Sequence, residues 1–313
     1  MEAKEAAGIR SRTQRADYQA TADPALNEAA DRTADIKLLG YGELYDLWER
    51  QQWQTQELDF SQDREDWHER IPEEERFQRM YGLSSFFIGE QKVAEELGPI
   101  MRAAPTEDQK VFLCTQIADE ARHVAFFDRF YSEVGVLAAD SLDGRLIETS
   151  EHLNPDFGVL FDELLHERVD RLAREPEDLT TLVEAVTIYH MVVEGMLALT
   201  GQHFIIDFNE RAGTLPAFVE GFTKVARDEH RHVAFGARFL RDMVRRDPAH
   251  VDTIRRTLAL VAPAADGVLR PKWFEGGDDE PLLFGVSVSE TRAFAMKALE
   301  RRLAAIGLAA AAA

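Results

Sequence analysis

Hydrophobic residues recur every three to four positions along most of the chain, and the alternating pattern typical of strands is scarce. This spacing predicts amphipathic helices. Four long helical segments stand out, at about 74–103, 106–134, 178–211 and 215–246. Glycine and proline interrupt the pattern between segments, and neither a glycine-rich phosphate loop nor a βαβ alternation is present. The sequence therefore predicts an all-α fold.

The two ends of the chain lack this pattern. Residues 1–35 are polar and weakly patterned, which predicts a flexible N-terminal arm. Residues 301–313 end in a run of alanines and are interpreted as a low-complexity tail. The span 36–300 is long enough to bury a sizeable core and is expected to form one helical domain.

Each long segment carries an acidic residue within its apolar stripe. Glu90 lies in the first segment, Glu120 in the second, Glu194 in the third and Glu229 in the fourth. A buried, ionised and unpaired carboxylate costs on the order of several kcal/mol. The stripes carry no lysine or arginine that could neutralise these glutamates. The sequence therefore predicts that something other than a side chain, such as a bound cation, neutralises these glutamates.

Two of these glutamates are followed, three positions later, by a histidine. Glu-x-x-His places two side chains one helical turn apart on one face, where they can hold the same metal ion. Four carboxylates and two neutral imidazoles also balance the charge of two divalent cations. Dinuclear helix-bundle proteins use this ligand set: two helices each supply one glutamate, and two others each supply a Glu-x-x-His motif. The predicted ligands are Glu90, Glu120, His123, Glu194, Glu229 and His232.

The Glu-x-x-His motif occurs twice more, in other surroundings. Glu65 and His68 lie in the charged stretch DREDWHER, and Glu163 and His166 lie in FDELLHERVDRL. Both pairs have charged neighbours rather than an apolar stripe. They are predicted to be solvated helix surface.

Composition narrows the functional classes. The 57 acidic and 36 basic residues give a net charge of -21, which disfavours nucleic acid and anionic membranes as partners. A single cysteine, Cys114, excludes an intrachain disulfide and a zinc site built on thiolates. No apolar run of transmembrane length and no signal peptide is apparent, so a cytoplasmic protein is expected.

From about Tyr45 to Met243 the sequence resembles the ribonucleotide reductase small-subunit superfamily of ferritin-like carboxylate proteins. The resemblance rests on the segments WQTQELDFSQDREDW, GEQKVAEEL and ARDEHRH. It implies a ferritin-like four-helix bundle with additional helices, and a homodimer. Asp228 matches the position that binds a ligand histidine in that family, and Trp53 matches a tryptophan of its radical-transfer path. Asp119 also precedes a ligand glutamate, but is interpreted as surface charge.

Two departures from standard small subunits bear on function. The radical-bearing tyrosine of those proteins lies four residues after the first ligand histidine, where this chain has Phe127. The chain ends in alanines instead of a docking peptide for a large subunit. These differences disfavour a tyrosyl-radical generator. A small subunit without the radical, or a non-enzymatic iron-binding ferritin-like protein, remains an alternative.

The sequence resembles the R2-like ligand-binding oxidases more closely. That group has a valine three residues after the first ligand glutamate and a tyrosine five residues before the third, here Val93 and Tyr189. The resemblance implies that the metal centre activates O2 and forms an ether cross-link between these side chains. It also implies a bound long-chain fatty acid whose carboxylate contacts the metals. Lipid oxidation is a further activity that the resemblance leaves open, and the electron donor stays unknown.

The same resemblance implies a heterodinuclear cofactor, with a di-iron centre as the alternative. Manganese is expected at Glu90, Glu120 and His123, and iron at Glu194, Glu229 and His232, with Glu120 bridging. Small residues near the ligands are expected either to leave room for an acyl chain or to allow close helix packing. They are Ala94, Ala198, Gly201 and Gly236.

Overall fold

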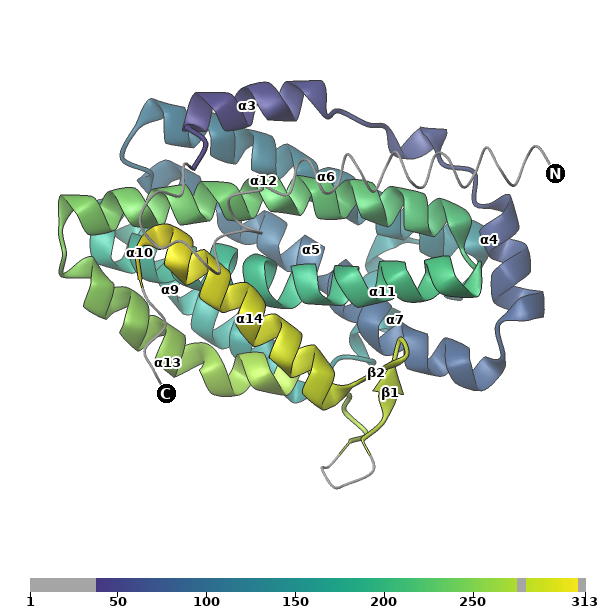
Figure 1. Ribbon diagram of the computed structural model, residues 1–313. Helices are drawn as coiled ribbons and strands as arrows, with labels where there is room; N and C mark the ends of the chain where they lie inside the picture. The colour runs from purple at the N-terminus through teal and green to yellow at the C-terminus, as the bar shows by residue number, and fades with distance from the viewer. Residues whose placement is uncertain (1–37, 275–279, 309–313) are drawn as a thin grey trace.

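The computed structural model describes residues 38–274 and 280–308, which fold into a helical bundle (Figure 1). The predicted long segments are confirmed as α5 (Glu73–Ala103), α6 (Glu107–Val134) and α12 (Pro216–Arg246), and as a composite third helix. That third helix consists of α10 (Leu179–Val186), the π-helical stretch η4 (Thr187–Ala198) and α11 (Leu199–Ala212). Observed and predicted ends differ by one residue at most.

Shorter elements surround these four helices. Before the bundle come α3 (Tyr41–Arg50), η1 (Thr55–Glu57), α4 (Ser61–Glu65) and η2 (Asp66–Arg70). Between α6 and α10 lie α7 (Leu142–Ser150), α8 (Pro155–Gly158), η3 (Val159–Leu165) and α9 (His166–Arg174). After α12 come α13 (His250–Val268), β1 (Leu282–Leu283), β2 (Val286–Ser287) and α14 (Val288–Ile306).

Local chemistry defines the ends of the long helices. Thr106 caps α6 by accepting a hydrogen bond from the backbone N–H of Gln109, and Gly135 ends that helix with a φ of 75°. Such left-handed termini favour glycine, which has no β-carbon to clash. At the start of α12, Asp63 accepts hydrogen bonds from the backbone N–H groups of Ala217 and Phe218. These contacts fix where α6 begins and ends and where α12 begins.

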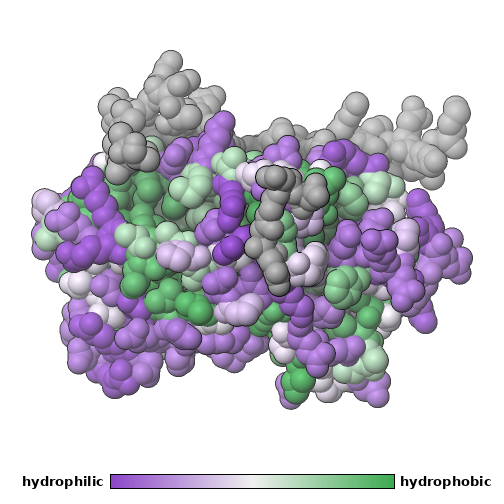
Figure 2. Space-filling view, turned by 90° about the horizontal axis from the view of Figure 1, so that it is seen from below, coloured by the Kyte–Doolittle hydropathy of each residue, from purple (hydrophilic) through white to green (hydrophobic). Residues whose placement is uncertain are grey.

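The long helices pack around two clusters of buried hydrophobic residues. Helix α5 packs against α6, and η4 packs against α12, α13 and α14. Helix α3 crosses α6 and α12 on one side of the bundle, and the β-hairpin projects from the lower edge of the molecule (Figure 1). Seen from below, hydrophilic side chains cover much of the surface, with hydrophobic groups gathered between them (Figure 2). The strongly apolar η4 lies inside the protein, since all of its residues except Ala198 are buried.

One helical stretch, Leu179–Ala212, has the length and hydropathy of a membrane span, which the sequence patterning missed. However, 83% of its apolar window is buried inside the protein, so its hydrophobicity is accounted for by the bundle core. The cytoplasmic location stays a prediction.

Only some of the predicted domain boundaries fall within the part of the chain that the structure describes. The arm proposed for residues 1–35 lies outside the described residues, as do residues 309–313 of the proposed tail. Helix α14 continues to Ile306 with Arg302 buried, so the first part of that tail is helical and packed.

Candidate metal centre

The six predicted ligands meet in the core of the bundle. Their metal-binding atoms form two buried groups, each with all atoms within 4.8 Å of one another. The first group is Glu90, Glu120, His123 and Glu229, and the second is Glu120, Glu194, Glu229 and His232. Glu120 and Glu229 belong to both groups, whereas the resemblance assigned a bridging role to Glu120 alone.

Several ligand atoms in this cluster lack hydrogen-bond partners among the described residues. Glu120, Glu194 and Glu229 each have one buried carboxylate oxygen without a partner, Oε2 in every case. Nδ1 of His232 is also buried and unpartnered, although it lies 3.3 Å from Glu120 Oε1. Unsatisfied buried polar atoms are rare in proteins. Two cations at this place would satisfy these atoms, so the cluster fits a dinuclear metal site.

The electrostatics of the cluster reflect burial and crowding. Burial raises the pKa of Glu90 and of Glu194 well above the usual value for a carboxyl group. Burial alone would also raise the pKa of Glu120, but the two histidines outweigh it and hold that pKa well below its usual range. The carboxylates in turn outweigh the effect of burial on His123 and His232 and raise the pKa of both imidazoles. Without metal, the cluster therefore retains protons that metal ions would displace.

An aspartate orients each ligand histidine from the opposite helix. His232 on α12 donates from Nε2 to Asp119 on α6 at 3.2 Å, and His123 on α6 donates to Asp228 on α12 at 3.4 Å. The interpretation of Asp119 as surface charge is wrong, because its side chain is 1% exposed. Since each histidine gives its Nε2 proton to an aspartate, its Nδ1 is left to face the metal site.

A layer of donors holds the two aspartates in place. Arg231, which is 1% exposed, donates from Nη2 to Asp119 at 2.9 Å and to Asp228 at 2.6 Å. Trp48 Nε1 donates to Asp119 at 2.9 Å, and Trp53 Nε1 donates to Asp228 at 2.7 Å. These contacts hold the pKa of Asp228 far below its usual value, despite its burial. Asp228 is thereby kept as a charged acceptor, and the side chain of Asp119 is held by donors from two directions.

Gln116 contacts the cluster from one turn before Glu120, and the sequence analysis did not single it out. Its Nε2 donates to Glu194 Oε1 at 2.7 Å, and its Oε1 lies 3.1 Å from His190 Nε2. Burial lowers the pKa of His190 to about 3, so this imidazole is neutral and donates to Gln116. Gln116 therefore occupies one oxygen of Glu194 and leaves Oε2 for metal. The sequence signal that could have identified Gln116 was its position as a polar residue on the buried face of α6.

The two residues of the expected cross-link both lie beside this cluster. Tyr189 is fully buried, and its hydroxyl donates to Glu120 Oε1 at 3.1 Å. Val93 is buried one turn after Glu90 and lines the same cavity as Glu90 and Glu194. Phe127 lies instead in an aromatic cluster, with its ring stacked on that of Phe86 at 6.3 Å.

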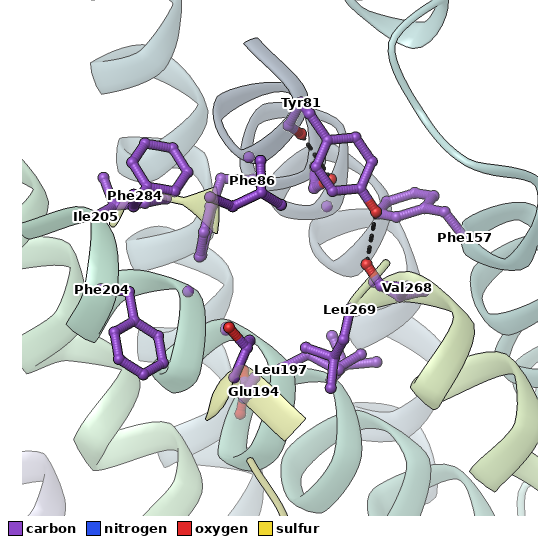
Figure 3. A pocket seen from close by; sticks show the side chains of 18 of the residues that line it. Tyr81, Phe86, Phe157, Glu194, Leu197, Phe204, Ile205, Val268, Leu269 and Phe284 are labelled. Atoms are coloured by element: carbon purple, nitrogen blue, oxygen red, sulfur yellow. Dashed lines mark hydrogen bonds between the residues drawn. The ribbon is translucent and has the colours of Figure 1, made fainter. Parts of the chain in front are cut away.

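An apolar cavity of about 140 Å³ reaches the carboxylates of the cluster (Figure 3). Glu90, Glu194 and Glu229 contribute to its lining at the metal cluster, and the remaining walls are mainly aliphatic and aromatic. Its hydroxyl groups are engaged in internal hydrogen bonds, with that of Tyr81 donating to Val268 O at 2.7 Å. A ligand in this cavity would meet polar groups mainly at the carboxylate end.

The four small residues behave differently. Ala198 and Gly201 line the cavity, whereas Ala94 and Gly236 are not among its lining residues. A β-carbon at Gly236 would lie 2.2 Å from the β-carbon of His190, so that glycine allows close packing of η4 on α12.

The two remaining Glu-x-x-His pairs are confirmed as surface residues. All four side chains are exposed. His68 Nε2 lies 2.9 Å from Val134 O, and His166 Nδ1 lies 2.7 Å from Glu96 Oε1. Neither pair belongs to a group of potential metal ligands within the described residues.

The fold and the site define a ferritin-like helical bundle whose buried carboxylate and histidine cluster fits a dinuclear metal centre. Residues 34–261 match the family model described as ribonucleotide reductase, small chain, and the chain belongs to this family.

Solved structures of R2-like ligand-binding oxidase are similar to the chain. Two point mutants with an aerobically reconstituted Mn/Fe cofactor each have 25% identity and a TM-score of 0.74. The alignments cover 84% and 87% of this chain, and 93% and 94% of those chains. A third mutant, with a non-activated Mn/Mn cofactor, has 25% identity and a TM-score of 0.72 over 84% of this chain and 92% of its own. The family and these structures indicate an oxidoreductase.

Proposed function

We propose that the protein is an O2-activating dinuclear Mn/Fe oxidase that holds a long-chain fatty acid and forms an ether cross-link between Val93 and Tyr189. The observation that carries this proposal is the apolar cavity, which reaches Glu90 and Glu194 and passes Val93. A metal-storage protein has no need of an apolar cavity of this kind at its metal cluster. The cavity therefore favours a site that places an organic ligand beside the metals.

The proposed metal assignment follows the two ligand groups. Manganese would be held by Glu90, Glu120 and His123, and iron by Glu194, Glu229 and His232, with a di-iron form as the alternative. Carboxylate and imidazole donors suit both metals. When bound, the centre would supply the binding and reduction of O2 and the oxidising power for the cross-link. Glu229, shared by both groups, would contact either ion.

In the proposed cross-linking step, Tyr189 would react from a protonated phenol that is hydrogen-bonded to the cluster. Burial raises the pKa of its hydroxyl well above the usual value, and the surrounding carboxylates add to this effect. The phenol therefore stays protonated in the resting site, where it donates a hydrogen bond to Glu120 Oε1 at 3.1 Å. Forming the C–O bond removes one hydrogen from Tyr189 and one from a C–H group of Val93. O2 would accept the two electrons and two protons released, and its reduction to two water molecules would be completed by two electrons from the Mn(II) and Fe(II) ions and two protons from solvent.

The fatty acid would lie with its carboxylate at the metals and its chain along the apolar walls. Glu194 points into this space (Figure 3). Burial of methylene groups would supply most of the binding free energy, because each contributes about 0.8 kcal/mol. We also propose that the protein forms a homodimer.

A second candidate is a small subunit of ribonucleotide reductase without the tyrosyl radical. This candidate is supported by a chain of hydrogen bonds from Trp53 through Asp228 to His123. The chain connects the loop that follows α3 to a proposed metal ligand. Phe127, in place of the radical tyrosine, has no hydroxyl to oxidise. Nucleotide reduction on addition of a reductase large subunit would favour this candidate.

The test of the oxidase is O2 uptake by metal-free protein after anaerobic loading with Mn(II) and Fe(II). We expect rapid uptake by the wild type and a large loss in Glu120→Gln, together with a fatty acid in the organic extract of the purified protein. A loaded protein that consumes no O2 would refute the proposed activity. If the Glu120→Gln variant binds the metals and consumes O2 as the wild type does, the assigned site is refuted.

A further inference from the structure

The β-hairpin carries a bulky residue in a backbone conformation that such residues rarely adopt. Strands β1 and β2 are joined by Phe284 and Gly285, with φ values of 51° and 77°. A two-residue turn with both φ angles positive favours asparagine, aspartate and glycine. At a positive φ the β-carbon of phenylalanine is crowded by its own backbone. A strained residue of this kind points to a role for its side chain.

The ring of Phe284 lies on a position that only glycine leaves open. A β-carbon at Gly82 on α5 would lie 2.6 Å from Cε2 and 3.0 Å from Cζ of this ring. The ring also packs edge-on against Phe208 on α11, with centroids 5.8 Å apart. The hairpin thus inserts one aromatic side chain between α5 and α11.

Phe284 lines the cavity at a distance from the metal cluster. It lies beside Ile205 at one side of the cavity, away from Glu194 (Figure 3). Its side chain is half-buried, and the neighbouring Leu282 is 59% exposed, so this wall faces solvent. Leu283 and Val286 of the hairpin line the cavity with it. A chain that starts at the carboxylates and fills the cavity therefore meets Phe284 before it reaches water.

We propose that Phe284 is a specificity-determining residue that limits the length of the acyl chain the cavity accepts. This inference rests on the proposed binding of a fatty acid at the metals. Each methylene buried against the walls raises affinity about fourfold. An acyl chain long enough to reach the ring must displace it from Gly82 and Phe208. Because these contacts are then broken, further methylenes no longer raise the affinity. Affinity then passes through an optimum as the chain is lengthened.

The test is a binding series on metal-loaded protein with straight-chain saturated fatty acids from octanoate to eicosanoate. For the wild type we expect affinity to rise about fourfold per methylene and then to fall beyond one length. Phe284→Asn keeps a residue that tolerates a positive φ but removes the ring, and should abolish the fall for long chains. Gly82→Ala should do the same, because its β-carbon excludes the ring from its present position. Leu282→Asn, in the same hairpin but outside the cavity lining, is the matched control and should retain the wild-type optimum.

The outcomes separate this inference from the proposed function. If the loaded wild type binds none of the acids, the fatty-acid proposal fails. If it binds them with an optimum that is unchanged in both Phe284→Asn and Gly82→Ala, the role of Phe284 is refuted while the binding site stands. A shift in Leu282→Asn as large as that in Phe284→Asn would also refute it, since hairpin stability rather than the ring would then set the length.

Discussion

Asp119 on α6 accepts a hydrogen bond from His232 on α12 at 3.2 Å. The reciprocal contact joins Asp228 on α12 to His123 on α6 at 3.4 Å. Helices α6 and α12 thus each supply one histidine to the cluster and orient the histidine of the other. Because both aspartates precede a ligand glutamate, the two halves of the site are coupled through the helices that carry them.

The first prediction concerns these aspartates. Asp119→Asn preserves shape but removes the charge that fixes the tautomer of His232, so we expect metal affinity at the second ligand group to fall about 10- to 100-fold. Asp228→Asn should weaken the first group similarly. Competition with a metal chelator measures both effects. The exposed Asp108→Asn, near the start of the same helix, should bind metal like the wild type. Unchanged affinity in Asp119→Asn would show that His232 is held by other contacts.

The second prediction separates the buried motif from its surface copy. Glu120→Gln removes a carboxylate shared by both ligand groups, and we expect it to lose most of the bound metal. Glu163→Gln changes the same motif on an exposed face and should retain the full metal content. Elemental analysis after removal of loosely bound ions measures the stoichiometry. Equal metal loss in both variants would argue against the assignment of the buried cluster.

The third prediction is that metal binding depends on pH. Because burial raises the pKa of Glu90 and Glu194 well above the usual value, the metal-free cluster holds protons that must leave when metal binds. Affinity should therefore decrease as the pH falls, with net proton release on loading. Calorimetric titration in buffers of different ionisation enthalpy counts the released protons. Loading without proton release would contradict this description of the cluster.

The fourth prediction concerns the acid stability of the metal-free protein. The pKa of His190 is lowered from 6.5 to about 3 by burial, so below pH 6.5 the unfolded chain takes up a proton that the folded protein refuses. Stability from this group is present above pH 6.5 and is lost as the pH falls toward 3. Between pH 7 and pH 5 the loss amounts to about 2 kcal/mol.

Denaturant unfolding of metal-free protein at several pH values tests this effect. His190→Gln should reduce the loss between pH 7 and pH 5, even if it lowers stability overall. The same slope in His190→Gln and wild type would place the acid sensitivity elsewhere.

Much of the fold could be predicted from the sequence because the hydrophobic spacing is strong. A carboxylate on an apolar helix face is costly to bury without a partner, and few kinds of site remove that cost. This reasoning identified Glu90 and Glu194 as candidate metal ligands. Gln116 and Asp119 were missed because their role depends on partners 78 and 113 positions away, to which helix periodicity is blind. The position of Phe284 could not be predicted, because it depends on a tertiary contact between a hairpin and Gly82.

The most direct test of the proposed oxidase is peptide mass spectrometry of metal-free protein that has been loaded with Mn(II) and Fe(II) and exposed to O2. We predict a cross-linked species that joins the peptides of Val93 and Tyr189 and is lighter than their sum by two hydrogen atoms. It should be missing in Tyr189→Phe and in protein loaded without O2. Absence of this species from wild-type protein that holds both metals after exposure to O2 would contradict the cross-linking oxidase and leave the dinuclear site standing.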